Sequence, residues 1–197
     1  MFYKYNKARR NQTEGPILSE TKQQDKPLFF EDPKIEPKPP GEFSVLYLLR
    51  RDIEACLDNK TPWPAAMMIL AGIDLLAKFN AGEDSVGNIG KRFRSYVNEH
   101  FEPLDEGELI FQLRNSLFQS FGLRSTDKKG NVYKFSVSAS PGQPFFQKRD
   151  GRHVVNVHAL NAAFEESIAN YRRTLTETLP LERFLSMVPE YGFIYIA

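Results

Sequence analysis

The stretch Leu113-Arg114-Asn115-Ser116-Leu117-Phe118-Gln119-Ser120-Phe121-Gly122-Leu123 decides how the rest of this chain is interpreted. Apolar residues recur in it at helical spacing, and the same stripe extends back to Leu109. We therefore predict an amphipathic helix that ends at Gly122. The helix carries Arg114 beside Asn115, and the amide of Gln119 follows five positions after the arginine.

Further helices are predicted on both sides of this segment. A one-sided apolar stripe begins after Ser44, and an almost wholly apolar helix over residues 65–79 ends at Ala81-Gly82. Another one-sided stripe runs from Phe93 to Phe101. A long helix is expected over residues 158–178, and a short one over 181–187. These segments predict a bundle of five to six helices.

A small β element interrupts the helical pattern. Residues 132–137 alternate as a strand, the turn Asp127-Lys-Lys-Gly130 precedes them, and residues 152–157 are the expected partner strand of a hairpin. The tail 191–196 is either a strand or an aromatic plug. The predicted fold class is therefore all-α, a helical bundle with a small inserted hairpin and an extended N-terminal arm.

Residues 1–42 differ in composition from the domain expected over 43–197. Met1 to Arg10 mix aromatic and basic residues without an acid, and residues 31–41 form a proline-rich charged spacer that cannot continue a helix. Three interpretations stay open for this arm. It is disordered, or it is pinned to its own domain or to a neighbour, or it contacts RNA phosphates and bases.

The Arg114-Asn115 pair with a polar residue five positions on resembles the arginine-x(4–6)-histidine signature of the HEPN superfamily. Many of these helical domains are metal-independent ribonucleases. Residues 70–77, 93–101 and 113–123 are similar to successive helices of bacterial HEPN proteins, and the resemblance covers about residues 44–185. The position of the histidine holds Gln119 in this chain.

The resemblance implies a role for each motif residue. Arg114 would stabilise charge on a phosphate, and Asn115 would orient the reacting group. Gln119 does not titrate near neutral pH, and loss of a general acid–base group costs about 10²–10⁴-fold in rate. Three alternatives follow: a buried polar or dimer-interface network, a site that binds RNA or a nucleotide, or a residual nuclease.

Two further residues bear on this site. The segment Arg94 to His100 also fits the loose arginine–histidine spacing, but His100 shares an apolar stripe, so it is either a core histidine or a substitute imidazole that turns toward Arg114. Asp74 interrupts the apolar helix, and a buried carboxylate needs a partner. The candidate partners are Arg114, Arg92 and Arg94, in a structural ion pair or in one that positions Arg114.

Charge and composition limit the other classes of function. The net charge of +1 creates no global field for nucleic acid, so RNA contact depends on local clusters. The candidates for RNA contact are Lys91, Arg92 and Arg94, with further basic pairs at residues 128–129 and 148–149. The alternative is that these charges only form a solvated surface without a ligand.

The sequence predicts a soluble cytoplasmic protein without metal or cofactor. Cys56 is the single cysteine and cannot form an internal disulfide. No zinc pattern, phosphate-cradling glycine loop or nucleophile elbow is present in the sequence. No secretory signal is expected at the first ten residues, and the apolar run 65–77 is shorter than the about 20 residues needed to span a bilayer.

Three functional hypotheses remain. The first is a catalytically degenerate HEPN-like protein that forms a homodimer through the motif helix and binds RNA, a nucleotide or a protein partner; the resemblance implies a binding, regulatory or toxin–antitoxin-like role for it. The second is a metal-independent endoribonuclease of toxin or defence type that uses Arg114 with His100 or with a histidine of a partner chain. The third is a purely structural interaction module whose N-terminal arm wraps a neighbour.

Overall fold

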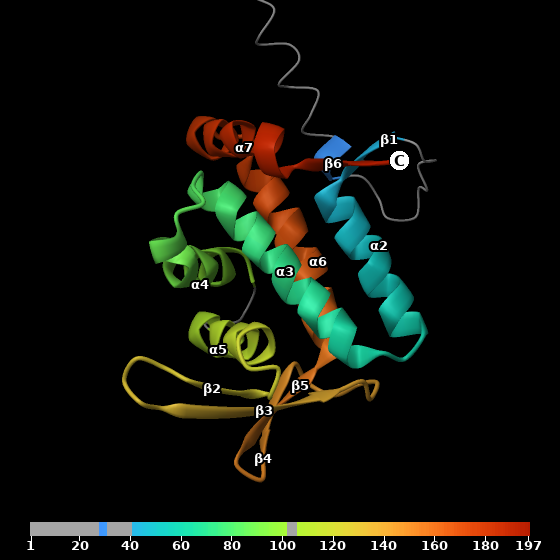
Figure 1. Ribbon diagram of the computed structural model, residues 1–197, viewed down its shortest axis with the longest axis vertical. Coiled ribbons are helices and arrows are strands. Elements are labelled where there is room, and N and C mark those ends of the chain that lie inside the picture. The colour runs from blue at the N-terminus through green and yellow to red at the C-terminus, as the bar shows by residue number, and fades with distance from the viewer. Residues whose placement is uncertain (1–27, 31–40, 102–105) are drawn as a thin grey trace, which may run out of the picture.

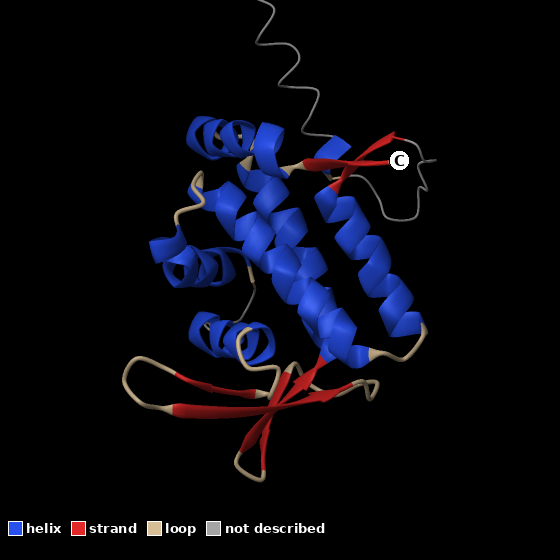
Figure 2. Ribbon diagram, in the orientation of Figure 1, coloured by secondary structure: helices blue, strands red, loops and turns tan. Residues whose placement is uncertain are grey.

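The computed structural model describes residues 28–30, 41–101 and 106–197. Within these ranges it contains six α-helices and six β-strands, and the strands form two sheets (Figure 2). The prediction of an all-α fold is therefore wrong, because the fold is mixed, with a helical bundle as its larger part. Strands of three or four residues are too short to show the alternation by which a strand is recognised in a sequence. The three strands that were not predicted are all of this kind: β1 (Gly41–Ser44), β2 (Arg124–Thr126) and β4 (Phe146–Arg149).

Helix α3 (Pro62–Ala81) is the centre of the bundle (Figure 1). It begins with Pro62 in its first turn and ends at Gly82, whose φ of 69° gives the left-handed cap expected from the sequence. A 3₁₀ turn at Val86–Asn88 leads into α4. Five helices contact α3: α2 (Val45–Asp58), α4 (Ile89–His100), α5 (Gly107–Phe118), α6 (Val157–Thr174) and α7 (Thr178–Tyr191).

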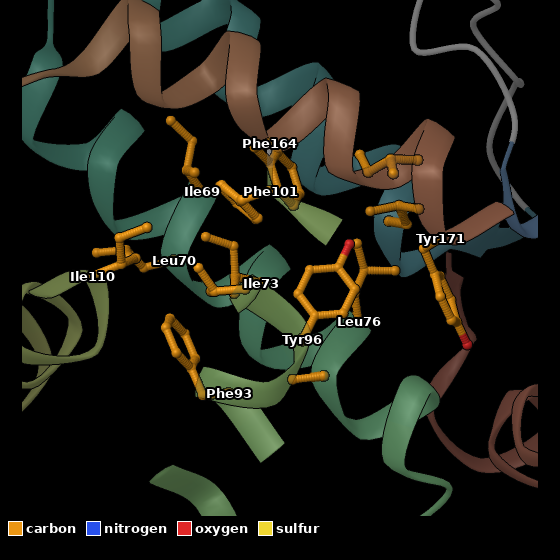
Figure 3. Close-up of a cluster of buried hydrophobic side chains, with 14 of the residues drawn as sticks. Ile69, Leu70, Ile73, Leu76, Phe93, Tyr96, Phe101, Ile110, Phe164 and Tyr171 are labelled. Atoms are coloured by element: carbon orange, nitrogen blue, oxygen red, sulfur yellow. The ribbon is translucent and has the colours of Figure 1, made fainter. Parts of the chain in front are cut away.

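The core is formed where these helices meet (Figure 3). Gly72 lets α6 approach α3 closely, since a Cβ at this position would overlap the ring of Phe164. Aliphatic side chains of α3 and aromatic side chains of α4 and α6 fill the space between the helices. The fully buried members include Ile69, Leu70, Ile73, Leu76, Phe93, Tyr96, Ile110, Phe164 and Tyr171.

A short segment of the predicted arm is part of this core. Phe29 is fully buried, and Phe30 is 6% exposed. The hydroxyl of Ser44 donates to the carbonyl of Phe29 at 2.7 Å and accepts from the backbone N–H of Tyr47 at 3.2 Å, so it caps α2 and holds residues 28–30 in place. The rest of the predicted arm up to residue 40 lies outside the described residues.

The larger sheet has the order β2-β3-β5-β4, with β3 at Val132–Ser138 and β5 at Arg152–Asn156. The two predicted strands do pair, but they are parallel, so the predicted hairpin between them is wrong. Instead β2 pairs with β3 and β4 pairs with β5, both antiparallel. The physical reason is the turn Asp150-Gly151, where two successive positive φ angles (51° and 72°) reverse the chain directly between β4 and β5.

The smaller sheet joins the two ends of the described domain. Strand β1 pairs antiparallel with β6 (Phe193–Ile196) next to α7 (Figure 1). Of the two alternatives for the C-terminal tail, the structure has the strand. The boundary predicted at residue 42 falls inside β1.

Of the described helices, only α3 is long and apolar enough to cross a membrane. It has 20 residues, more than the apolar run suggested. Half of its most apolar window is buried inside the protein, and other helices pack around it. This arrangement is compatible with a soluble protein.

Candidate functional site

The motif helix α5 is shorter than predicted. It ends at Phe118, with Gln119 as its C-cap, whereas the sequence predicted a helix that continues to Gly122. The hydroxyl of Ser120 lies within hydrogen-bonding distance of the carbonyls of Ser116 (2.8 Å) and Arg124 (3.0 Å) and can donate to either. This contact turns the chain toward β2. As a result Phe121, placed on the apolar stripe by the sequence, is 66% exposed.

Arg114 is held by Asp74 of α3. Its Nε and Nη2 both lie 2.8 Å from Asp74 Oδ2, and each side chain is 17% exposed. The guanidinium also lies over the ring of Phe118, 5.3 Å from the centroid. Of the three arginines considered for Asp74, the structure therefore selects Arg114. Asp74 Oδ1 is buried without a hydrogen-bond partner among the described residues.

Asn115 is oriented by its neighbour. Arg114 Nη1 donates to Asn115 Oδ1 at 3.3 Å, so the amide nitrogen of Asn115 is the end left to donate to a ligand. The contacts form a chain from Asp74 through Arg114 to Asn115. Arg114 is placed to position Asn115, and it does not line the groove described next.

Asn115 and Gln119 lie in a groove of about 670 Å³ between α4, α5 and the β2–β3 hairpin. A neighbouring hollow of about 520 Å³ shares Asn115, Gln119 and Thr126 with it. Figure 1 shows the hairpin below α5, with α4 on the other side of that helix. Charged residues line the groove: Lys91, Arg94, Lys128 and Lys129 against Glu108 and Asp127.

The structure places the basic clusters found in the sequence in three different surroundings: in the groove, buried, and outside the groove. Lys91 and Arg94 join Lys128-Lys129 in the groove, although more than 30 positions separate the two groups. Arg92, also expected to contact RNA, is buried instead, because it donates to Asp84 Oδ1 and to the carbonyl of Ser85, both at 2.8 Å. The pair at residues 148–149 lies on β4, outside the groove.

The wall formed by α4 and α5 is built around Arg94. Its guanidinium lies 3.3 Å from Glu108 Oε2 and 4.7 Å from the centroid of the Phe111 ring. Glu108 Oε1 accepts from Gln112 Nε2 at 2.7 Å, and Gln112 is almost wholly buried. Arg94 is therefore held in a defined position with part of its surface open to the groove.

The opposite wall is a hairpin loop organised by Asp127. Its carboxylate accepts from the backbone N–H of Lys129 (2.8 Å) and from both the backbone and the side-chain amide of Asn131 (2.9 and 2.8 Å). These hydrogen bonds, led by that of the Asn131 side chain, lower the pKa of Asp127. The sequence showed this segment as a turn, but not that its lysines face the motif helix.

His100 occupies a different part of the molecule. Its Nε2 lies 3.2 Å from Asn80 Oδ1, and the rings of Tyr96 and Tyr171 lie 4.8 and 5.4 Å away, centroid to centroid. Burial lowers the pKa of His100, partly opposed by Glu99. Asn80 is six residues beyond Asp74 on α3, or about 9 Å along the helix. The structure thus does not bring His100 to Arg114.

Two further findings complete the description of the site. Among the described residues, no group of three or more His, Cys, Asp or Glu side chains is placed to hold a metal ion. We found no match to this chain among models of protein families, curated proteins or solved structures.

Proposed function

We propose that this chain is a catalytically degenerate HEPN-like protein that binds RNA in the groove between α4, α5 and the β2–β3 hairpin. One observation carries the proposal. The polar residues of the motif, Asn115 and Gln119, line the same groove as two basic clusters from distant parts of the sequence. The resemblance supplied the motif alone, and the convergence of the lysines on it is independent support.

The charges of the groove favour a polyanion. Four cationic side chains outnumber two carboxylates in the groove; Glu108 is paired with Arg94, and Asp127 accepts hydrogen bonds within its own loop. Lysines bind phosphates as point charges, and phosphate contacts make RNA affinity depend on salt. The amides of Asn115 and Gln119 donate and accept hydrogen bonds, as phosphates and bases require.

Binding without cleavage follows from the side chains at hand. No histidine is among the residues that line the groove, and Gln119 stands where the signature has its imidazole. His100 is buried against Asn80 and two tyrosines. We therefore propose a binding role in place of a metal-independent endoribonuclease. A toxin–antitoxin-like role belongs to the same proposal and rests on the resemblance, and a cytoplasmic location rests on the single cysteine.

The test is the binding of a fluorescent RNA oligonucleotide, measured by anisotropy over a range of salt concentrations. Lys128→Ala/Lys129→Ala should weaken binding and reduce the slope of log K against log salt by about 0.7 per lost phosphate contact. The matched control is Lys148→Ala/Arg149→Ala on β4, which removes two exposed cations outside the groove. An equal loss in both variants, or no binding by the wild type, would reject the groove as an RNA site.

The homodimer implied by the resemblance is a separate part of the proposal. Two copies joined through α5 would place their grooves side by side and double the number of phosphate contacts. Light scattering of the protein without RNA gives the mass directly. A monomeric mass at the concentrations used for binding would remove the dimer from the proposal and leave the single groove.

A further inference from the structure

Arg94 is held in the groove without using its hydrogen-bond donors. Its Nη1 forms an ion pair with Glu108 Oε2 at 3.3 Å, and its guanidinium lies over the ring of Phe111. No group among the described residues accepts a hydrogen bond from this guanidinium. A Cβ at Gly90 would lie 3.1 Å from Arg94 Nη1 and 2.8 Å from the Phe111 ring, so the glycine leaves room for the two to meet. Arg94 is therefore placed by its neighbours and keeps its N–H donors for a ligand.

Arg114 is the useful contrast, because it also lies over a phenylalanine ring, that of Phe118. Its Nε donates to Asp74 at 2.8 Å and its Nη1 donates to Asn115 at 3.3 Å. These bonds hold its side chain at 17% exposure, whereas that of Arg94 is 36% exposed and lines the groove. The fold thus uses the donors of Arg114 and leaves those of Arg94 to the occupant of the groove.

The carboxylate of Glu108 stands beside Arg94 in the same groove and is 48% exposed. Gln112 Nε2 donates to its Oε1 at 2.7 Å, which holds the carboxylate in place on α5. A phosphate that approached Arg94 would meet this negative charge. A nucleobase carries acceptors and N–H donors along one edge, so it can bind the arginine and the carboxylate together. The pair therefore suits a base better than a phosphate, and the lysines of the groove remain for the phosphates.

The groove also presents aromatic rings to a flat ligand. Phe111 belongs to the wall formed by α5, Tyr133 belongs to the hairpin wall, and both line the groove. The hydroxyl of Tyr133 donates to Asp127 Oδ2 at 3.3 Å. Burial, Asp127 and the charge of Glu108 raise the pKa of Tyr133, so the two walls lie close enough for Glu108 to act on Tyr133. A base that enters between the walls meets rings as well as the pair of Arg94 and Glu108.

We propose that Arg94 and Glu108 form a base-reading pair that selects an unpaired guanine of RNA in this groove. Arg94 donates to O6 of the guanine, and Glu108 accepts from its N1–H and its exocyclic amine. Guanine alone among the four bases presents two neighbouring N–H donors beside an acceptor, whereas the others turn lone pairs toward the carboxylate. The inference rests on the proposed function and narrows its ligand to single-stranded RNA that contains guanine, since a duplex already engages this edge.

The test measures the anisotropy of four single-stranded RNA oligonucleotides, one of uridine alone and three with a single central guanine, adenine or cytosine. The wild type should bind the guanine strand roughly 5- to 150-fold more tightly than each of the others. Arg94→Lys keeps the charge and removes the planar fork, and Glu108→Gln keeps the shape and removes the carboxylate. In each variant the preference for guanine should fall toward one.

Arg51→Lys is the matched control for these variants. Arg51 forms an exposed ion pair with Asp52 on α2 and does not line the groove, so its replacement should leave the preference for guanine unchanged. Urea unfolding of each variant shows whether it is folded in the assay. A pair that only links α4 to α5 would change stability in Arg94→Lys and Glu108→Gln without changing the ratio of affinities.

Several results would overturn the inference. A wild type that prefers no base, or a base other than guanine, while the lysine variants still weaken binding, would leave the RNA groove standing without this base-reading pair. Equal strengthening of binding to all four strands in Glu108→Gln would make Arg94 a phosphate contact. A preference for guanine that survives in both variants would place the selective contact elsewhere. Absence of binding to every strand would overturn the proposed function as well.

Discussion

Two segments of this chain carry an arginine followed by a polar side chain at similar spacing. One segment places its arginine at the groove, and the other places its polar side chain there. In α4, Arg94 lies at the groove, while His100 is buried at the far end against α3 and α6. In α5, Arg114 is withdrawn onto Asp74, while Gln119 is exposed in the groove. The groove therefore receives its arginine from one segment and its amide from the other.

The difference shows that spacing along a helix does not define a site. Each segment turns one of its two ends toward the core, and contacts with α3 decide which end that is. Asp74 pairs with Arg114, and six residues later Asn80 pairs with His100. The imidazole of His100 in α4 and the guanidinium of Arg114 in α5 are each held by a side chain of α3, so neither segment assembles an arginine–histidine pair.

The largest expected effect comes from restoring the missing imidazole. Gln119→His places a group that titrates near neutral pH in the groove that Arg94 also lines, about 7.5 Å of helix rise from Arg114. We expect this variant to cleave single-stranded RNA about 10²-fold faster than the wild type, at the low end of general acid–base catalysis. The measurement is cleavage of a labelled oligonucleotide.

The controls for this prediction use the two arginines. Gln119→Asn changes the side chain without adding a titrating group and should stay at the wild-type rate. In the Gln119→His background, Arg94→Ala should remove the gain if Arg94 is the cation at the groove. Loss of the gain in Arg114→Ala, in a protein that is still folded under the assay conditions, would instead show that Arg114 leaves Asp74 when RNA binds.

The next effect concerns stability and separates the same two arginines. Arg114→Ala should lower the free energy of unfolding by about 2–3 kcal/mol, because it leaves the Asp74 carboxylate without its partner. The loss should be smaller than for a fully buried pair, since both side chains are 17% exposed. Arg94→Ala should cost under about 1 kcal/mol, since Arg94 and Glu108 are 36% and 48% exposed. Urea unfolding of both variants measures the difference.

A double variant identifies the source of that loss. Asp74→Asn/Arg114→Ala removes the stranded charge and should recover part of the stability lost in Arg114→Ala. Equal losses in Arg94→Ala and Arg114→Ala would mean that the pair with Asp74 is no stronger than a surface ion pair, and the contrast between the two segments would lose its energetic basis.

The long helices were predictable because their patterns are long. The helix after Ser44, the apolar helix ended by Gly82 and the helix that holds Phe93 all follow from spacing and caps. The sheet was predictable only in part. The short strand β2 has no periodic pattern. The parallel pairing of β3 with β5 depends on the turn at Asp150-Gly151. The Asp-Gly dipeptide does indicate a hairpin, here between β4 and β5.

The residues of the candidate site could be picked out in the sequence, but their meeting in one groove could not be predicted. The sequence showed Asn115, Gln119 and the lysines at 128–129 separately. Their meeting depends on α5 ending at Phe118 and on β2 turning back beneath it, which no local pattern specified. Arg92 was indistinguishable from Arg94 in the sequence, since only the position of Asp84 after α3 decides which of the two is buried.

The smallest expected effect tests the buried end of α4. Burial lowers the pKa of His100, so the folded protein resists a proton that the unfolded chain accepts below pH 6.5 or so. The free energy of unfolding should therefore fall as the pH is lowered from about 7.5 to 5.5, and the nearby Glu99 should reduce the effect. In His100→Gln this fall should be shallower. His153→Gln removes a second histidine with a lowered pKa, on β5, and is measured for comparison. A fall that is unchanged in His100→Gln would show that the imidazole takes up its proton in the folded state, and His100 would then be free to act as an acid.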